Sequence, residues 1–132
     1  MPSASVPPTV EAYFAAVNKR DFTAMANLFA PDVEIRPVGS APLRGRDAVL
    51  AYYPALLDNF AEHHDEPTRV HVAGDVVTVE IRFEGRTADG APVEFDAVDI
   101  FDLDAEGRIT QLSLWYDTRD VLRQIRAVPA TD

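Results

Sequence analysis

Residues 93–103 alternate between apolar and polar side chains with a period of two, the pattern of a strand that buries one face. One face carries Val93, Phe95, Ala97, Asp99, Phe101 and Leu103. Five of these six residues are apolar, so the alternation predicts that Asp99 points into the core. The opposite face carries Glu94, Asp96 and Asp102 together with Val98 and Ile100, and we expect it to lie nearer to solvent or to a partner surface.

A carboxylate on an apolar strand face constrains the chemistry of the chain. An isolated ionised carboxylate is very costly there, so Asp99 must be paired, be well hydrogen-bonded, or stay protonated with a raised pKa. Backbone amides could satisfy the carboxylate, in which case its role is structural. A protonated Asp99 would instead donate a hydrogen bond to a ligand, which makes this residue a candidate for a functional site.

The first half of the sequence has helical periodicity and the second half has strand periodicity, an order that favours an α+β fold over a doubly wound one. The apolar stripe of the first helix comprises Val10, Tyr13, Phe14 and Val17, with Thr9 as the expected N-cap. Asp21 is expected to cap a second short helix that packs against the first. A third helix follows a loop at 38–46, and Pro54 inside it is expected to kink or divide it near Tyr53.

Five strands are expected, at about residues 33–36, 69–73, 76–84, 92–103 and 108–116, and they predict a strongly twisted, mostly antiparallel sheet. In the third of them, Val77, Val79, Ile81 and Phe83 share one face. In the last, Tyr116 shares the cavity-facing parity of Leu112 and Leu114, whereas Trp115 is on the opposite face and is expected at an interface. Asp117 is expected to be the N-cap of a terminal helix at 119–126.

At 132 residues the chain has the length of one domain, expected at 9–126 between tails at 1–8 and 127–132. No apolar run is long enough to span a bilayer and residues 1–8 lack the pattern of a signal peptide, so we expect a cytoplasmic protein without a membrane partner. The net charge of −10 and the scattered basic residues argue against nucleic-acid binding. The absence of cysteine excludes thiolate catalysis, disulfides and zinc–thiolate sites.

The histidines offer one alternative to a purely structural role. His63, His64, Asp65 and Glu66 are adjacent in sequence, and ligands one residue apart rarely converge on one ion, so no metal site is expected. His71 alternates with apolar neighbours, and it either lines the pocket of the sheet, where it would serve as a general base, or faces solvent. No phosphate loop, dinucleotide fingerprint, nucleophile elbow or cofactor lysine motif is present, and we expect no cofactor.

Three segments carry a family resemblance that covers about residues 9–122. "VEAYFAAVNKRDFTAMANLFAPDVEIRP" resembles the opening helix hairpin and first strand of the nuclear transport factor 2-like superfamily. "PLRGRDAVLAYY" resembles its loop and third helix, and "VDIFDLDAEGRITQLSLWYD" resembles its last hairpin. The resemblance implies a cone-shaped, curved, mostly antiparallel sheet wrapped around three N-terminal helices, a cystatin-like α+β roll. This fold hosts enzymes, binding proteins and adaptors, so the fold alone assigns no function.

Within the superfamily, the chain resembles the ketosteroid isomerases and the SnoaL-like polyketide cyclases. This resemblance implies a cofactor-independent isomerase or cyclase that acts by enolate chemistry on an apolar carbonyl metabolite such as a polyketide, a steroid-like compound or a terpenoid. Carried over by motif, Tyr13 is the tyrosine of the oxyanion hole and Asp99 is the protonated aspartate. Tyr53 supports Tyr13 by hydrogen bonding, and Phe29 stands where some members have a third tyrosine. The expected substrate pocket also contains Phe83, Leu114 and Tyr116.

The general base of the steroid isomerases is missing from the matching position, which carries Arg36. Glu34 lies two residues earlier on the same strand face, so Glu34 and His71 are the candidate bases, and Arg36 either pairs with a carboxylate or orients the substrate. Limonene epoxide hydrolases share the fold, but their second aspartate would fall near Leu114. Two alternatives without catalysis remain: a binding protein for an apolar ligand, and an interaction domain that forms a homodimer through the outer sheet face.

Overall fold

A computed structural model describes residues 6–126. The predicted C-terminal tail at 127–132 and residues 1–5 of the predicted N-terminal tail lie outside the described residues. The helices are α1 (Pro8–Lys19), α2 (Phe22–Ala26), α3 (Arg46–Leu57) and α4 (Thr118–Arg126). The strands are β1 (Phe29–Pro37), β2 (Leu43–Arg44), β3 (Phe60–Ala73), β4 (Val76–Thr87), β5 (Pro92–Leu103) and β6 (Ile109–Tyr116). None of the helices in the described range is long and apolar enough to cross a membrane.

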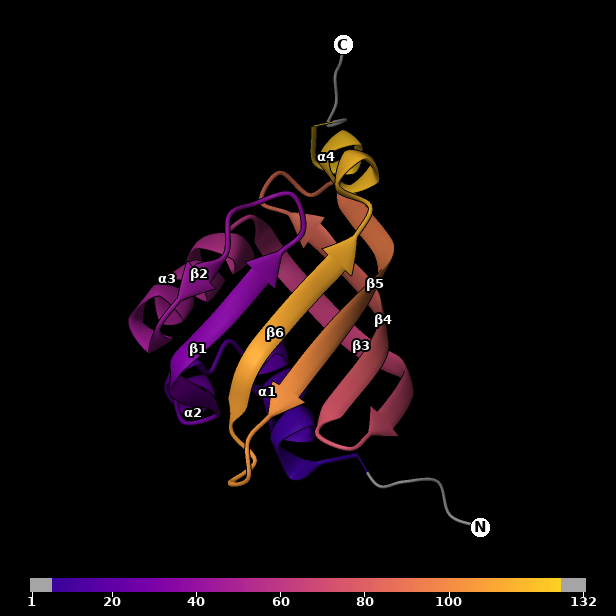
Figure 1. The fold of residues 1–132 in the computed structure, drawn as a ribbon. Helices are drawn as coiled ribbons and strands as arrows, with labels where there is room; N and C mark the ends of the chain where they lie inside the picture. Colours follow the sequence, from indigo (N-terminus) through magenta and orange to yellow (C-terminus); the bar gives the residue numbers. More distant parts are fainter. Residues whose placement is uncertain (1–5, 127–132) are drawn as a thin grey trace.

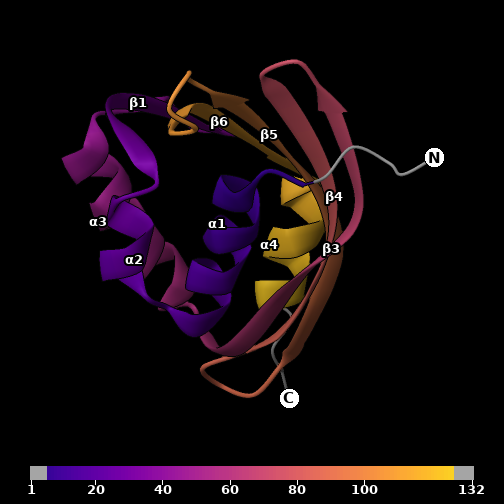
Figure 2. The same ribbon diagram turned by 90° about the horizontal axis from the view of Figure 1, so that it is seen from below.

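The strands form one sheet in the order β2-β1-β6-β5-β4-β3 (Figure 1). β1 pairs with β6 in parallel, and the other neighbours are antiparallel. The long strands β3, β4 and β5 curve so that α1 lies inside the sheet, while α2 and α3 flank it at the β1 side (Figure 2). The predicted α+β fold, with a curved sheet around the N-terminal helices, is therefore confirmed.

The inner face of the sheet is the one that the alternation of apolar residues predicts. On β5, Asp99 is buried in line with the fully buried Phe101, and on β4 the four predicted residues Val77, Val79, Ile81 and Phe83 are buried. On β6, Leu112 and Leu114 are buried whereas Trp115 is 51% exposed on the other face. Burial of these side chains against α1 supplies the core of the fold.

β3 is much longer than the predicted strand at 69–73, because it begins at Phe60. Its pairing with β4 shifts register between Phe60 and Glu62 and again between Pro67 and Arg69. Each added residue moves the following side chains to the opposite face of the strand. His63 and Asp65 therefore lie on the inner face before the second shift, and His71 faces outward after it.

Two of the three predicted helix caps are present. The Ala24 amide donates to Asp21 Oδ1 at 3.0 Å, and the Asp120 amide donates to Asp117 Oδ1 at 3.0 Å. Thr9 is not an N-cap, because α1 already begins at Pro8, a residue well suited to a first helical position. Pro54 does not divide α3, because the helix runs without interruption from Arg46 to Leu57, so the expected division is wrong.

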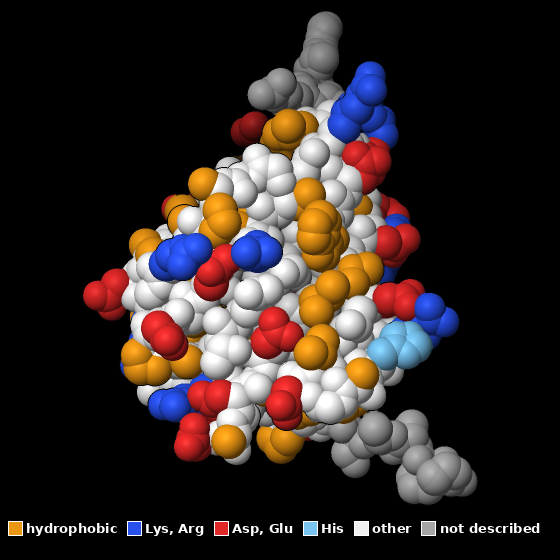
Figure 3. All heavy atoms as spheres, in the orientation of Figure 1, with side chains coloured by type: hydrophobic (Ala, Val, Ile, Leu, Met, Phe, Trp, Pro, Cys, Tyr) orange, Lys and Arg blue, Asp and Glu red, His pale blue; other side chains and the backbone are white. Residues whose placement is uncertain are grey.

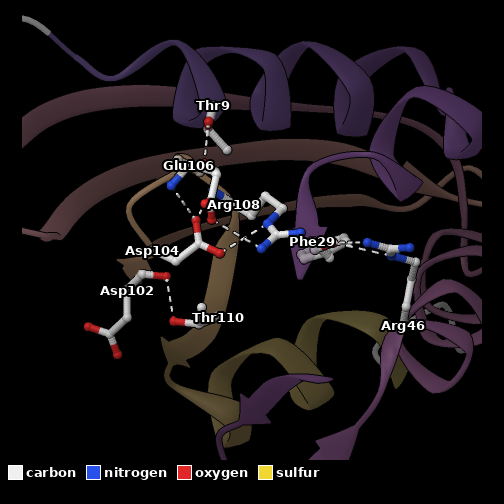
Figure 4. A network of polar contacts seen from close by, with 9 residues as sticks. Thr9, Phe29, Arg46, Asp102, Asp104, Glu106, Arg108 and Thr110 are labelled. Atoms are coloured by element: carbon white, nitrogen blue, oxygen red, sulfur yellow. Dashed lines mark hydrogen bonds and ion pairs between the residues drawn. The ribbon is translucent and has the colours of Figure 1, made fainter. Parts of the chain in front are cut away.

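The turn between β5 and β6 is held by polar contacts around Asp104 (Figure 4). Asp104 Oδ1 accepts hydrogen bonds from the amides of Glu106 and Arg108 at 2.9 and 2.8 Å, and Arg108 Nε donates to Oδ2 at 3.0 Å. Thr9 Oγ1 donates to the Gly107 carbonyl at 2.6 Å, which ties the start of α1 to this turn. Beyond this turn the pairing of β5 with β6 shifts register once, between Asp102 and Leu103, and then places Asp99 opposite Leu114.

Candidate functional site

A cavity of about 470 Å³ lies between the inner face of the sheet and the helices α1, α3 and α4. Its apolar wall comprises Ile81, Phe83, Phe95, Ala97 and Leu114 from the sheet, Leu56 and Leu57 from α3, and Val121, Leu122 and Ile125 from α4. The volume suits a small organic molecule, and a mostly apolar wall with a few polar groups is typical of ligand sites. All four tyrosines of the chain line this cavity.

Tyr13 and Tyr53 form the first pair of polar groups in the cavity. Their hydroxyl oxygens are 2.7 Å apart, and either can be the donor. The ring of Tyr13 is fixed by edge contacts with Phe14 and Phe101, each with ring centroids 5.1 Å apart. Burial raises the pKa of both tyrosines well above the ordinary value, so the hydroxyls stay protonated.

Asp99 is the second polar element, and its position follows from strand register. Its neighbours are Val79 on β4 and Leu114 on β6, and only 6% of the residue is exposed. Burial raises the pKa of Asp99 well above its ordinary range, and the negative charge of Asp65 raises it further. This shift favours the protonated form of Asp99. No hydrogen bond to its side chain is formed within residues 6–126, and its carboxyl group lines the cavity, where a ligand can reach it.

Tyr13, Tyr53 and Asp99 thus line one apolar cavity. One tyrosine hydroxyl donates to the other, so one tyrosine O–H and the protonated form of Asp99 can donate to a ligand. Such groups, held in place in a site with little water, stabilise negative charge that develops on a ligand oxygen. The predicted cavity positions of Phe83, Leu114 and Tyr116 also agree with the structure.

The prediction that Glu34 and Arg36 face the pocket is wrong. Val33 and Ile35 take the core side of β1 and are fully buried, which leaves the residues between and after them on the outer face. Arg36 Nε donates to Glu34 Oε2 at 2.6 Å, and 55% of the Arg36 side chain is exposed. This hydrogen bond lowers the pKa of Glu34. Glu34 is therefore a weaker base, and it also lies on the face of β1 opposite to the core.

His71 and Phe29 are also absent from the cavity wall. The side chain of His71 is 59% exposed on the outer face, near Glu80, because of the register shift in β3. Phe29 is fully buried behind the tyrosines, with its ring stacked on Tyr53 at a centroid distance of 6.3 Å. Phe29 supports the tyrosine pair and does not contact the space that a ligand would fill.

The sequence interpretation missed Asp65, Tyr52 and the apolar face of α4 as parts of the cavity. Val121 and Ile125 are four residues apart, so helical spacing could have revealed a face of α4 directed at the sheet. Asp65 had a weaker signal, because β3 lacks the apolar alternation that identifies the other strands. Next to it, His63 is buried with Nδ1 3.4 Å from Asp65 Oδ1, and His63 Nε2 has no hydrogen-bond partner.

Comparison with known proteins agrees with this geometry. The sequence matches the family model of the SnoaL-like domain over residues 10–112. A steroid Δ-isomerase from Nocardioides simplex is 29% identical over 123 residues, which cover 91% of this chain and 96% of that protein.

Two solved structures are similar over almost the whole chain. A hypothetical protein with a ketosteroid isomerase-like fold from Catenulispora acidiphila, in complex with trimethylamine, aligns with a TM-score of 0.83 and 26% identity, covering 97% of this chain and 100% of that one. A candidate SnoaL-like polyketide cyclase from Jannaschia sp. CCS1 aligns with a TM-score of 0.86 and 19% identity, covering 98% and 100%. At 19% identity the second likeness is one of fold alone.

Proposed function

Because this chain belongs to the SnoaL-like family, we propose that it catalyses the isomerisation or cyclisation of an apolar carbonyl compound through an enolate, without a cofactor. The observation that carries the proposal is the convergence of protonated Tyr13, Tyr53 and Asp99 on one apolar cavity. The likeness to a steroid Δ-isomerase supports the same chemistry. A polyketide, a steroid-like compound or a terpenoid would match the apolar wall.

The tyrosine pair and Asp99 suit a reaction in which charge moves onto oxygen, because one tyrosine O–H and the Asp99 O–H are free to donate to a ligand. In the ground state the substrate carbonyl is neutral and accepts weak hydrogen bonds. When a carbon next to the carbonyl loses a proton, the oxygen becomes an enolate and the same bonds strengthen. Donors that favour the charged transition state over the neutral ketone lower the barrier, and a donor pair fixed by packing needs no reorganisation.

The proposal predicts that the cavity binds an ionised phenol, which mimics an enolate. We expect 4-nitrophenol to bind preferentially as the phenolate, visible as a higher ionised fraction in its absorption spectrum than at the same pH in buffer. Asp99→Leu removes one donor and should weaken this binding about 10- to 100-fold, the value of a hydrogen bond to a charged group. Asp96→Asn on the outer face of β5 is the matched control and should bind like the wild type. Preferential binding of the neutral phenol would contradict the proposal.

We also propose that a second copy of the chain covers the outer face of β5 and β6. Hydrophobic side chains form a band over these strands, bordered by charged groups (Figure 3). Trp115 is exposed there, and its partner in the antiparallel register is Val98. An exposed tryptophan within an apolar band is typical of an interface.

This dimer is testable by light scattering coupled to size-exclusion chromatography. The wild type is expected at twice the chain mass of 14.5 kDa, and Trp115→Arg is expected to shift toward the monomer because a charge replaces the apolar contact. Leu122→Arg is a control of similar exposure, because Leu122 lies on α4 at the cavity, on the inner side of the sheet, and this variant should stay dimeric. A wild type that elutes as a monomer at every concentration loaded would refute the dimer.

A further inference from the structure

We infer that Asp65 is the general base of this cavity, and that it removes the proton whose loss creates the enolate. The inference rests on the proposed function and deepens it, since neither base candidate from the sequence faces the cavity. Among the described residues that line the cavity, only Asp65 and Asp99 carry an ionisable group other than a phenol. Asp99 acts as a donor in the proposed function, so Asp65 is the remaining carboxylate at the cavity wall that can accept a proton.

The two aspartates lie in different surroundings, which suits different tasks. Asp99 lies between apolar neighbours with 6% of the residue exposed. The side chain of Asp65 is 21% exposed and is within reach of one hydrogen-bond donor, His63 Nδ1, at 3.4 Å. A nearby pair of carboxylates in unequal environments divides into an acid and a base, because the charge of one disfavours the ionisation of the other. Burial is the main cause that raises the pKa of Asp99, and the negative charge of Asp65 raises it further.

The backbone of Asp65 is held by the helix that carries Tyr13. The Asp65 amide donates to Asn18 Oδ1 at 2.8 Å, and Asn18 Nδ2 donates to the Asp65 carbonyl at 3.0 Å. Asn18 is five residues after Tyr13 on α1. α1 therefore holds Asp65 on β3 at a fixed position relative to the Tyr13 hydroxyl, which would donate to the enolate oxygen. Proton abstraction requires such a fixed distance between the base and the group that stabilises the enolate.

The surroundings of the carboxylate also limit its movement. The ring of His63 is stacked on Phe83, with centroids 6.1 Å apart and planes 2° from parallel, and the His63 side chain is only 1% exposed. Phe83 is itself part of the cavity wall and is the register partner of Asp65. Asp65 thus lies on a paired strand, next to a packed ring, and lines the cavity.

The proposed step conserves atoms and charge. The ionised Asp65 takes a proton from the carbon next to the substrate carbonyl, and the electron pair of that C–H bond forms a carbon–carbon double bond. The carbonyl π electrons move to oxygen, where Tyr13 and Asp99 donate hydrogen bonds. Neutral Asp65 then returns the proton to another carbon of the enolate in an isomerisation, or to the oxygen formed by carbon–carbon bond closure in a cyclisation.

Proton exchange of 2-tetralone in D₂O tests this step without knowledge of the natural substrate. The ketone is small enough for the cavity and has activated protons beside its carbonyl, whose loss is followed by proton NMR. We expect Asp65→Asn to slow protein-catalysed exchange about 10²- to 10⁴-fold, the range of general base catalysis. It should bind 4-nitrophenolate at least as tightly as the wild type, because it removes a negative charge. Glu66→Gln, the exposed neighbour on β3, is the control and should exchange at the wild-type rate.

A second variant separates loss of the base from loss of the cavity. In Asp65→Ala the space of the side chain is open, so added acetate is expected to restore exchange in proportion to its concentration, with no such effect on the wild type. Equal exchange by wild type and Asp65→Asn would overturn the inference and leave the proposed function standing. Loss of 4-nitrophenolate binding in Asp65→Asn, or no rescue by acetate, would also overturn it. A wild type that neither binds the phenolate nor exchanges the ketone would refute the proposed function itself.

Discussion

Asp99→Asn is expected to be more stable than the wild type, by an amount that grows with pH. Burial raises the pKa of Asp99 in the folded protein, whereas in the unfolded chain its pKa is near the ordinary value of about 3.9. Between these two values the folded state holds a proton that the unfolded state has lost, so the stability of the wild type falls as pH rises. For one proton, the unfolding free energy falls by about 1.4 kcal/mol per pH unit. Asparagine has nearly the same shape and cannot ionise, so the unfolding free energy of the variant does not fall with pH for this reason.

Urea unfolding at a series of pH values from 4 to 8 measures this effect. The difference in unfolding free energy between Asp99→Asn and wild type should increase with pH until the folded-state pKa is reached, and then level off. Asp96→Asn is the control, because that side chain is on the outer face of the same strand and is 82% exposed. A difference that does not change with pH would mean that Asp99 is ionised in the folded protein. The predicted result would mean that the protein gives up stability at neutral pH to keep a protonated carboxyl group in its cavity.

The parts of the fold that the sequence predicts well are those whose strand faces differ in polarity. β4 and β5 bury apolar residues on one face and carry charged residues on the other, so their alternation identifies the inner face and places Asp99 on it. On β6, Leu112 and Leu114 alternate with Gln111 and Ser113 in the same way. The same reasoning correctly separates Leu114 and Tyr116 from Trp115.

The alternation of apolar residues does not identify β3, because its inner side chains face the cavity and the C-terminal end of α1. His63 and Asp65 occupy inner positions without an apolar pattern, and two register shifts interrupt the period. The predicted strand therefore begins too late and Asp65 is missed. Of the two orientations that the sequence leaves open for His71, the solvent-facing one is correct, so His71 is not the base. Bulges arise from pairing with the neighbouring strand, and a single sequence carries little trace of them.

β1 illustrates a different limit. Alternation correctly predicts that Glu34 and Arg36 share a face, but it does not say which face. The parallel pairing with β6 and the burial of Val33 and Ile35 decide that question, and a shift of one residue reverses every side chain.

Tyr13→Phe is expected to lower the rate of enolisation strongly while the variant remains folded. The phenylalanine keeps the ring that packs against Phe14 and Phe101, and it removes only the hydroxyl that bonds to Tyr53. Loss of one donor from an oxyanion hole costs about 10²- to 10³-fold in rate. Because Tyr53 would lose its partner, a small part of this effect is expected to appear as weaker binding, and most of it as a lower rate for the bound ketone.

The most direct test of the account is therefore the exchange of 2-tetralone protons in D₂O by the wild type and by Tyr13→Phe, with Asp96→Asn as the control and circular dichroism to confirm folding. The account predicts that the wild type exchanges the protons beside the carbonyl well above the buffer rate, that Tyr13→Phe loses about 10²- to 10³-fold of that activity, and that the control loses none. Equal rates for wild type and Tyr13→Phe, or a wild-type rate no higher than that of buffer, would contradict the claim that these hydroxyls stabilise an enolate.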